Sequence, residues 1–157
     1  MAYVRLLQDP TPLVRAVYFV DQAVGKGRTN RRDDVLLVQF FLKAMSGKKD
    51  PVSAMMMAPT GQTPLAVDGI CGNQTVAYIN HFQTVLNSGS KNPSVWKDGS
   101  IDPVPPGATH GAIHQRVLSM ILLNTMYAGF FGQEQHSRIH ADPNFPSELL
   151  NRFFVRS

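Results

Sequence analysis

The stretch "AVDGICGNQTVAYINHFQ", residues 66–83, decides the fold, because it places a tight turn directly before a helix. Asp68-Gly69 is a turn dipeptide: an aspartate carboxylate accepts hydrogen bonds from backbone N–H groups two residues on, and glycine tolerates a positive φ. Gly72 precedes the helix at a point where we expect a side chain to crowd the turn or a neighbouring helix. The stretch has no nucleophile with a base beside it, so we expect it to hold a shape rather than to do chemistry.

The helix after this turn is predicted from apolar residues that recur at helical spacing, namely Val76, Ile79, Phe82 and Leu86. Thr75 lies in its first turn and either caps the helix or bonds within it. We expect Phe82 in the core, and we expect Gln83 to satisfy a loop backbone from inside the fold.

An earlier helix is predicted over "DDVLLVQFFLKAM", residues 33–45. Thr29 or Asn30 can cap it, and Asp33 and Asp34 lie in its first turn, where the helix dipole favours acidic side chains. The segment is apolar nearly all round, so more than one element must cover it.

These two segments together resemble the peptidoglycan-binding-like domain family. The family pairs a helix of the form D-V-x-x-V-Q-x-x-L with V-D-G-x-x-G-x-x-T and an apolar helix that ends in F-Q. The matching positions are Asp34, Val35, Val38, Gln39, Leu42, Val67, Asp68, Gly69, Gly72, Thr75, Ile79, Phe82 and Gln83. The pieces "AVGKGRTN" (23–30) and "DGSIDP" (98–103) are similar to the family's lead-in and second turn. The chain departs from the pattern at Cys71, where the family often has an aromatic residue, and in the longer loop 46–64.

The resemblance implies a mainly α fold, a compact three-helix peptidoglycan-binding-like domain with long loops. We expect this domain over residues 23–130, between an N-terminal extension, 1–22, and a C-terminal extension, 131–157, that packs on the domain. The third helix is predicted from about His110 to Phe130. The sequence contains no internal repeat.

The two extensions carry weaker signals. "PLVRAVYFV", residues 12–20, mixes β-branched and aromatic residues and is predicted as a strand or an extended arm. "DPNFPSELLNRFF", residues 142–154, is predicted as a turn and a last short helix, with Pro146 near its first position.

Composition bounds the class of protein. The chain has 157 residues, of which 43% are hydrophobic, and a formal net charge of +4, which suit one globular domain. Four basic residues cluster in "KGRTNRR", but no nucleic-acid fold signature accompanies them, so we expect no nucleic-acid partner. The most apolar run, 117–131, has 15 residues and is short for a membrane span, so none is expected. We see no Sec-type leader pattern in the first residues of the sequence, so we expect a protein that is either cytoplasmic or exported by a non-Sec route to the cell envelope.

The resemblance implies a non-catalytic module that recognises peptidoglycan or a related cell-wall glycan and needs no cofactor. The candidate ligand face of the second helix carries Gln74, Tyr78 and His81, where a sugar ring could stack on Tyr78. The alternative is an ordinary helix surface, or Tyr78 packed under a terminal extension. Trp96 is either an exposed anchor or a plug for the core, and Arg31 of the basic cluster is a further candidate contact.

Metal chemistry is the basis of the enzyme alternative. His110 with His114 and His136 with His140 have the i, i+4 spacing at which one helix can present two imidazoles to zinc. Neither pair has the adjacent glutamate of a metallopeptidase, so we expect no metal site and no metal-dependent hydrolase. Cys71, the single cysteine, is either a nucleophile or an inert small hydrophobe in a tight turn, and it excludes an internal disulfide.

The second hypothesis is a protein-interaction or structural component, either a homo-oligomer or a part of a secretion or phage-like assembly that reuses the fold. The hypothesis is based on more apolar residues than a three-helix domain of this kind needs for its core. These residues are Leu36, Phe40, the methionine triplet 55–57 and "LLNRFFVRS", 149–157. The methionines of the triplet either form an adaptable contact surface or fill a gap in the core.

Overall fold

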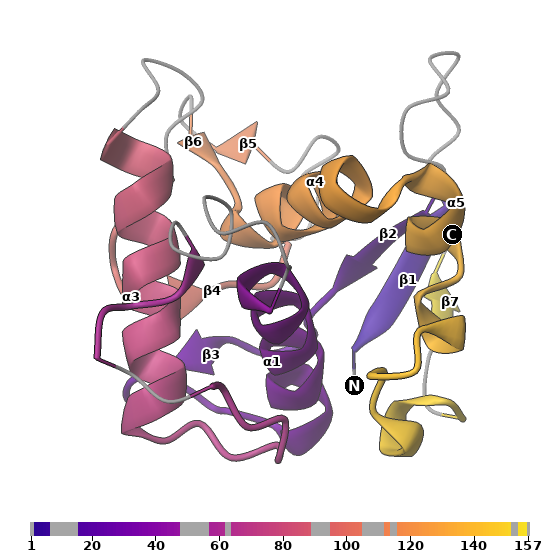
Figure 1. Cartoon of the computed structure of the whole chain (residues 1–157), viewed down its shortest axis with the longest axis horizontal. Helices are drawn as coiled ribbons and strands as arrows, with labels where there is room; N and C mark the ends of the chain where they lie inside the picture. Colours follow the sequence, from indigo (N-terminus) through magenta and orange to yellow (C-terminus); the bar gives the residue numbers. More distant parts are fainter. Residues whose placement is uncertain are drawn as a thin grey trace.

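The computed structural model in Figure 1 describes residues 2–6, 16–47, 57–61, 64–88, 95–104, 112–113, 116–151 and 154–156. Helix is the predominant structure in these residues. Four α-helices have described bounds, α1 (Arg32–Ser46), α3 (Asn73–Ser88), α4 (Ser119–Phe131) and α5 (Gln133–Ser137), and two 3-10 helices follow them, η1 (Ile139–Ala141) and η2 (Ser147–Leu149). None of the helices in the described ranges has the length and hydropathy to cross a lipid bilayer.

Three small sheets complete the described structure. The first has the order β2-β1-β7, in which β1 (Tyr3–Leu6) pairs antiparallel with β2 (Ala16–Phe19) and parallel with β7 (Phe154–Arg156). The second pairs β3 (Val24–Gly25) with β4 (Ser100–Ile101), and the third pairs β5 (Ala112–Ile113) with β6 (Arg116–Val117), both antiparallel. The first sheet therefore joins the two predicted extensions to each other.

The helix α1 lies in the middle of the molecule, between α3 on one side and the β2-β1-β7 sheet on the other (Figure 1). It is buried on almost every side, as its apolar pattern predicts. Phe40 packs edge-on against Phe145, with ring centroids 5.2 Å apart, and against Tyr127 of α4 at 5.7 Å. Leu36 and Phe40 expose only 2% and 1% of their surfaces, so the chain itself covers two of the side chains that motivated the interaction hypothesis.

The start of α1 differs from its predicted capping. The residue before the helix is Arg31, which makes no side-chain cap, and both predicted caps lie earlier in the chain. Asn30 instead turns back onto β3: its Oδ1 accepts the Gly25 N–H at 2.8 Å, and its Nδ2 donates to the Gly25 carbonyl at 2.9 Å. The capping prediction for Thr29 and Asn30 was therefore wrong, because the Asn30 amide is used to close the loop before the helix.

Asp34 fastens the preceding chain to α1. Its carboxylate is fully buried and accepts the backbone N–H groups of Asp21 at 2.9 Å and Gln22 at 3.0 Å. Burial raises the pKa of this carboxyl above its ordinary value. The aspartate of the family motif is thus a structural residue here.

The third helix is shorter than predicted, and the C-terminal segment contains less helix than predicted. The helix α4 begins at Ser119 rather than near His110, and β5 and β6 occupy part of the interval. Pro146 lies directly before η2, in agreement with its predicted position near a helix start. This helix has only one 3-10 turn, and the strand β7 follows it. The strand predicted in 12–20 is confirmed over Ala16–Phe19. Met57 is buried in the core, whereas Met55 and Met56 lie outside the described residues.

Candidate functional site

Gln39 of α1 holds the Asp68-Gly69 turn. Its Oε1 accepts the N–H groups of Asp68 at 3.1 Å and Gly69 at 2.9 Å, and its Nε2 donates to Asp68 Oδ1, to the Ile70 carbonyl and to Thr75 Oγ1, each at 3.0 Å. Asp68 Oδ1 also accepts the Ile70 N–H at 2.9 Å, two residues on, as predicted. This bond and the one from Gln39 lower the pKa of Asp68. We call this set of residues the first bracket.

Gln83 of α3 repeats the arrangement at the Asp98-Gly99 turn. Its Oε1 accepts the Gly99 N–H at 2.9 Å, and its Nε2 donates to the Ser100 carbonyl at 2.8 Å, to Ser119 Oγ at 3.2 Å and to Asp98 Oδ1 at 3.3 Å. Asp98 Oδ1 in turn accepts the Ser100 N–H at 3.0 Å. The predicted role of Gln83, satisfying a loop backbone from inside the fold, is confirmed. We call this set the second bracket.

The two brackets form a structural repeat. In each, a buried glutamine holds an Asp-Gly turn whose glycine has a positive φ, 76° in the first and 70° in the second. In each, the glutamine Nε2 also donates a hydrogen bond to a hydroxyl at the start of a later helix, Thr75 in α3 or Ser119 in α4. The brackets therefore link α1, α3 and α4 in series by the same device. Gly72, in contrast, has no heavy atom within 4 Å of the place where a Cβ would stand, so the predicted crowding at Gly72 was wrong.

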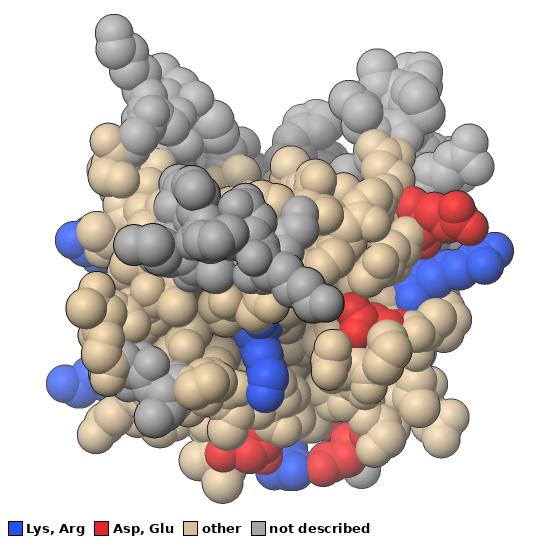
Figure 2. Space-filling model, in the orientation of Figure 1, with Lys and Arg blue, Asp and Glu red and all other residues tan. Residues whose placement is uncertain are grey.

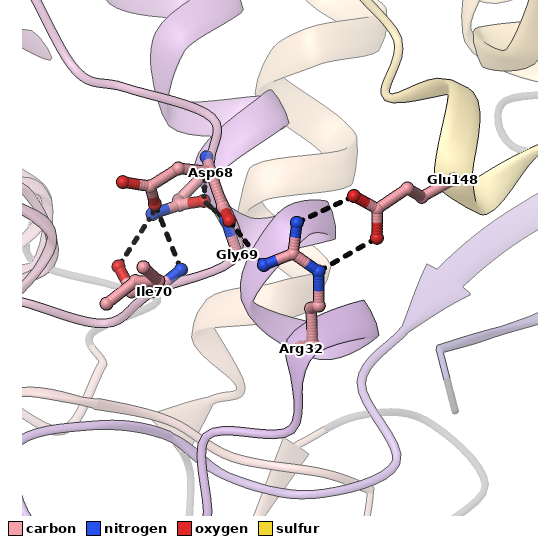
Figure 3. Close-up of polar contacts among 6 residues, drawn as sticks. Arg32, Asp68, Gly69, Ile70 and Glu148 are labelled. Atoms are coloured by element: carbon pink, nitrogen blue, oxygen red, sulfur yellow. Dashed lines mark hydrogen bonds and ion pairs between the residues drawn. The ribbon is translucent and has the colours of Figure 1, made fainter.

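Arg32 extends the first bracket to the C-terminal segment (Figure 3). Its Nη1 donates to the Asp68 carbonyl at 2.6 Å, while Nε and Nη2 bind the two carboxylate oxygens of Glu148 at 2.8 and 2.6 Å. The Glu148 carboxylate raises the pKa of the guanidinium further above its ordinary value. A Cβ on Gly69 would meet Arg32 Cγ at 2.8 Å, so the glycine also makes room for this clamp.

The predicted ligand face of α3 is occupied by the protein itself. Gln74 accepts the Ala66 N–H at 3.2 Å and donates to the Pro64 carbonyl at 3.3 Å, which ties the preceding segment to the helix. Tyr78 exposes only 2% of its surface, and burial raises the pKa of its hydroxyl. The ring of Tyr78 therefore has no open face for a sugar, and its predicted stacking role was wrong.

The remaining predicted contacts lie on different elements. His81 and Trp96 are half-buried. Val95, which precedes Trp96, is held by Asn87, whose Oδ1 accepts the Val95 N–H at 3.0 Å and whose Nδ2 donates to the Val95 carbonyl at 3.1 Å. Arg31 has a half-exposed side chain and pairs with Asp21 at 3.4 Å. Their roles in ligand binding stay predictions.

The histidine pair of the C-terminal segment does not form a joint ligand set. His136 is buried in α5, whereas His140 is exposed in η1, and Arg138 with φ −128° interrupts the helix between them. His110 and His114 lie outside the described residues. Across the described ranges, no group of three or more His, Cys, Asp or Glu side chains could hold a metal ion.

His136 belongs instead to a buried polar cluster with Asn124 of α4. Asn124 Oδ1 accepts the Tyr18 N–H at 2.9 Å and lies 3.0 Å from His136 Nε2, and its Nδ2 donates to the Tyr18 carbonyl at 2.9 Å and to the Met120 carbonyl at 2.7 Å. Because Asn124 Oδ1 is an acceptor, His136 Nε2 carries the hydrogen. Burial lowers the pKa of His136 to about 4, so the imidazole is neutral at pH 7.

Cys71 is half-buried beside the core, in the turn of the first bracket. Burial raises the pKa of its thiol, which disfavours the reactive thiolate. The environment thus supports the interpretation of Cys71 as an inert small hydrophobe.

Two adjoining hollows lie beside the ends of α1 and α4. The first hollow has a volume of about 440 Å³ and is lined by Phe40, Lys43, Ala44, Gly47, Val67, Phe131, Asp142 and Asn144. The second has about 470 Å³ and is lined by Phe131, Glu134, Gln135, Arg138, Ala141, Asp142 and Pro143. Phe131 and Asp142 belong to both, so the hollows are neighbours. Such volumes lie in the range of small-molecule sites.

The boundary between the hollows is held in place by Asp142. Its Oδ2 accepts the Tyr127 hydroxyl at 2.7 Å, and its Oδ1 accepts the Asn144 N–H at 2.9 Å. Burial is the main cause that raises the pKa of Tyr127, and the Asp142 carboxylate adds to it, so the phenol stays protonated as a donor. The sequence did not predict this site, because most of the residues that line it lie C-terminal to the family motif. That segment has no motif whose residue spacing indicates a binding site.

Comparison of the chain with family models, with curated proteins and with solved structures finds no match. The resemblance to peptidoglycan-binding-like domains therefore rests on the motif residues alone.

Proposed function

We propose that this protein is a non-catalytic module that binds peptidoglycan or a related cell-wall glycan through a three-helix peptidoglycan-binding-like domain. The observation that supports the proposal is the pair of brackets: Gln39 with Asp68-Gly69 and Gln83 with Asp98-Gly99. The brackets use five of the motif residues that carry the resemblance, Gln39, Asp68, Gly69, Thr75 and Gln83, and they link α1, α3 and α4. A shared fold does not establish a shared ligand, so the ligand needs its own support.

The two hollows are the proposed contact surface. They combine an aromatic wall at Phe131 with an amide at Asn144 and charged groups at Lys43 and Arg138. Sugar and peptide units both bind to such mixtures of apolar surface and directed polar groups. The charged side chains on the face in Figure 2 are scattered, with acidic and basic residues near one another. A nucleic acid, with its row of phosphates, would instead need a continuous basic patch. Arg31, His81 and Trp96 remain predicted contacts outside the hollows.

The groups at the hollows are suited to holding a ligand rather than to reacting with it. Asp142, the acid between them, already accepts bonds from Tyr127 and from the backbone of Asn144. Hydrogen bonding and stacking are the chemistry we assign to this surface, and the proposal includes no catalytic step.

Co-sedimentation with purified, protein-free sacculi tests the proposal. We expect the chain to pellet with sacculi in a saturable manner and to remain in solution with cellulose. An unrelated basic protein of similar net charge is the control for non-specific adsorption. No sedimentation above this control would contradict the function.

A matched pair of aromatic variants places the contact surface. Phe131→Ala removes the wall shared by the hollows, whereas Phe130→Ala removes the preceding aromatic residue, which lines neither of them. We expect weaker sacculus binding only for Phe131→Ala, compared at a temperature where both variants are folded. Equal binding by the two variants would move the site elsewhere.

The alternative, an interaction or structural component, is favoured by two exposed side chains. Ile70 and Leu150 expose 64% and 51% of their surfaces and are each two residues from a group that Arg32 binds, Asp68 and Glu148. Sedimentation velocity of the wild type and of the Ile70→Ser and Leu150→Ser variants tests it. Self-association that both substitutions abolish would favour this alternative, and a monomer throughout would count against a homo-oligomer.

A further inference from the structure

We infer that the two hollows bind the peptide part of the wall polymer, a short peptide with both carboxylate and ammonium groups, rather than its sugar part. The inference rests on the proposed function, and it goes further by assigning the ligand's chemical class. It follows from the charges, the walls and the layout of the hollows.

Charges of both signs line the hollows. Lys43 and Asp142 lie on the first, and Arg138, Glu134 and Asp142 lie on the second. The ion pairs of the described residues involve other side chains, so neither Lys43 nor Arg138 has a carboxylate partner among them. A ligand carboxylate can make a charge-assisted bond to either cation, which is stronger than a bond from a neutral sugar hydroxyl.

The acidic groups suit the ammonium groups of the same ligand. Asp142 Oδ2 accepts the Tyr127 hydroxyl and the Gln135 amide, whereas Oδ1 accepts only the Asn144 N–H among the described bonds. A carboxylate has about four acceptor sites, so acceptor capacity remains on Oδ1. Glu134 adds a second carboxylate on the other hollow. Opposite charges on both hollows match a peptide that carries both signs better than they match a simple anion.

The walls and the layout also fit a peptide. Phe40, Val67 and Phe131 give the first hollow an apolar surface for aliphatic side chains. The two hollows share Phe131 and Asp142, so a chain molecule can lie across this boundary with one side chain in each.

Three soluble probes separate the peptide from the sugar. Calorimetric titration of the full chain would use the free wall peptide, glycan oligosaccharides from which the peptide has been removed, and the intact disaccharide-peptide. We expect similar dissociation constants for the free peptide and the intact fragment, and no detectable heat with the bare glycan. Binding of the bare glycan with no response to the free peptide would overturn the inference.

Charge variants test the site itself. We expect Lys43→Ala and Arg138→Ala each to weaken peptide binding by about tenfold, with melting temperatures near that of the wild type. Lys97→Ala and Arg28→Ala remove exposed cations outside the hollows and serve as matched controls with unchanged affinity. Equal effects of all four substitutions would indicate general electrostatic attraction and would overturn the assignment.

Sacculus assays keep failure of this inference distinct from failure of the proposed function. Because an amidase releases soluble glycan strands, intact sacculi and the released strands are both immobilised on beads for the comparison. Binding to the immobilised sacculi that is absent from the stripped strands supports both. Equal binding to the two materials overturns only the peptide assignment. Peptide binding that depends on Lys43 without sacculus binding overturns only the wall function, and silence in every assay overturns both.

Discussion

The side chain of Asn124 in α4 pairs with the backbone of Tyr18 in β2 as a neighbouring strand would. It accepts the Tyr18 N–H and donates to the Tyr18 carbonyl, both at 2.9 Å. Because β2 is at one edge of the β2-β1-β7 sheet, these backbone groups have no further strand to bind within the described residues. The asparagine thus satisfies buried backbone groups and blocks pairing with another strand at that point.

Replacing Asn124 by leucine tests this role. The variant keeps the side-chain size but leaves both Tyr18 backbone groups and His136 Nε2 without their partner, so we expect the free energy of unfolding to fall by at least about 1–3 kcal/mol. Thr125→Ala, on the exposed side of α4, is the control and should change stability by no more than about 0.5 kcal/mol. Urea denaturation measures both. A leucine variant as stable as the control would show that the pairing adds nothing.

His136 gives the stability a defined pH dependence. Burial lowers its folded pKa to about 4, against 6.5 for an ordinary histidine, so the unfolded state binds the proton more readily. This residue's contribution therefore penalises the folded state as pH falls from 6.5 towards 4, by up to about 1.4 kcal/mol per pH unit. We expect denaturation midpoints to decrease across that window.

His136→Gln isolates this effect, since glutamine keeps an N–H donor but does not titrate. Asp34 has a raised pKa, which acts with the opposite sign in acid, and it is present in both proteins. The difference in unfolding free energy between wild type and variant should therefore change with pH between 6.5 and 4 in favour of the variant. A difference that is constant over this interval would contradict a buried, neutral His136.

The brackets predict a matched pair of destabilised variants. Gln39→Leu and Gln83→Leu each leave the N–H of a turn glycine without its acceptor, so each should lower the unfolding free energy by about 1–3 kcal/mol. The brackets share no residue, so the two losses should add within about 0.5 kcal/mol. Gln133→Ala, at an exposed helix start, is a neutral control. Abolished sacculus binding in a Gln39 variant of unchanged stability would make the turn a binding site instead.

Gly69 and Gly72 should respond oppositely to alanine. Gly69 has φ 76° and a Cβ there would meet Arg32 at 2.8 Å, so we expect Gly69→Ala to cost about 1–2 kcal/mol. Gly72 lies in open space without a positive φ, and Gly72→Ala should be neutral or stabilise by up to about 1 kcal/mol through the unfolded chain. Thermal melts compare them. A Gly72 variant with the larger loss would restore the crowding expected from the sequence.

Local patterns in the sequence were sufficient for the helices and turns of the motif. The apolar spacing of α1 and α3, the aspartate bond within the Asp68-Gly69 turn and the inward role of Gln83 all follow from residues close in sequence or from side-chain chemistry. The structural repeat of the brackets does not appear as a sequence repeat. Only a glutamine, an Asp-Gly pair and a hydroxyl residue recur, and the number of residues between them differs in the two brackets.

Contacts between distant segments account for what sequence reasoning missed. Helical spacing placed Tyr78 on an outer face, but only 2% of its surface is exposed, and its hydroxyl hydrogen bonds with the Leu65 backbone and the Ser46 side chain. Within the described part of the chain, the three residues of β7 pair with β1, which is distant in the sequence. A local pattern of apolar residues cannot predict a pairing over such a separation. The hollows likewise form only when the segment after α4 lies beside α1.

The parallel pairing of β1 with β7 has a consequence for synthesis of the protein. Tyr3 pairs with Phe154, so β1 is synthesised well before β7, the strand with which it pairs in parallel. Until then β1 has only β2 as a partner, and a two-stranded ribbon is marginally stable in water. The helices linked by the brackets lie between these two strands in the sequence and can form earlier, whereas the third strand of the sheet can pair only after β7 has left the ribosome.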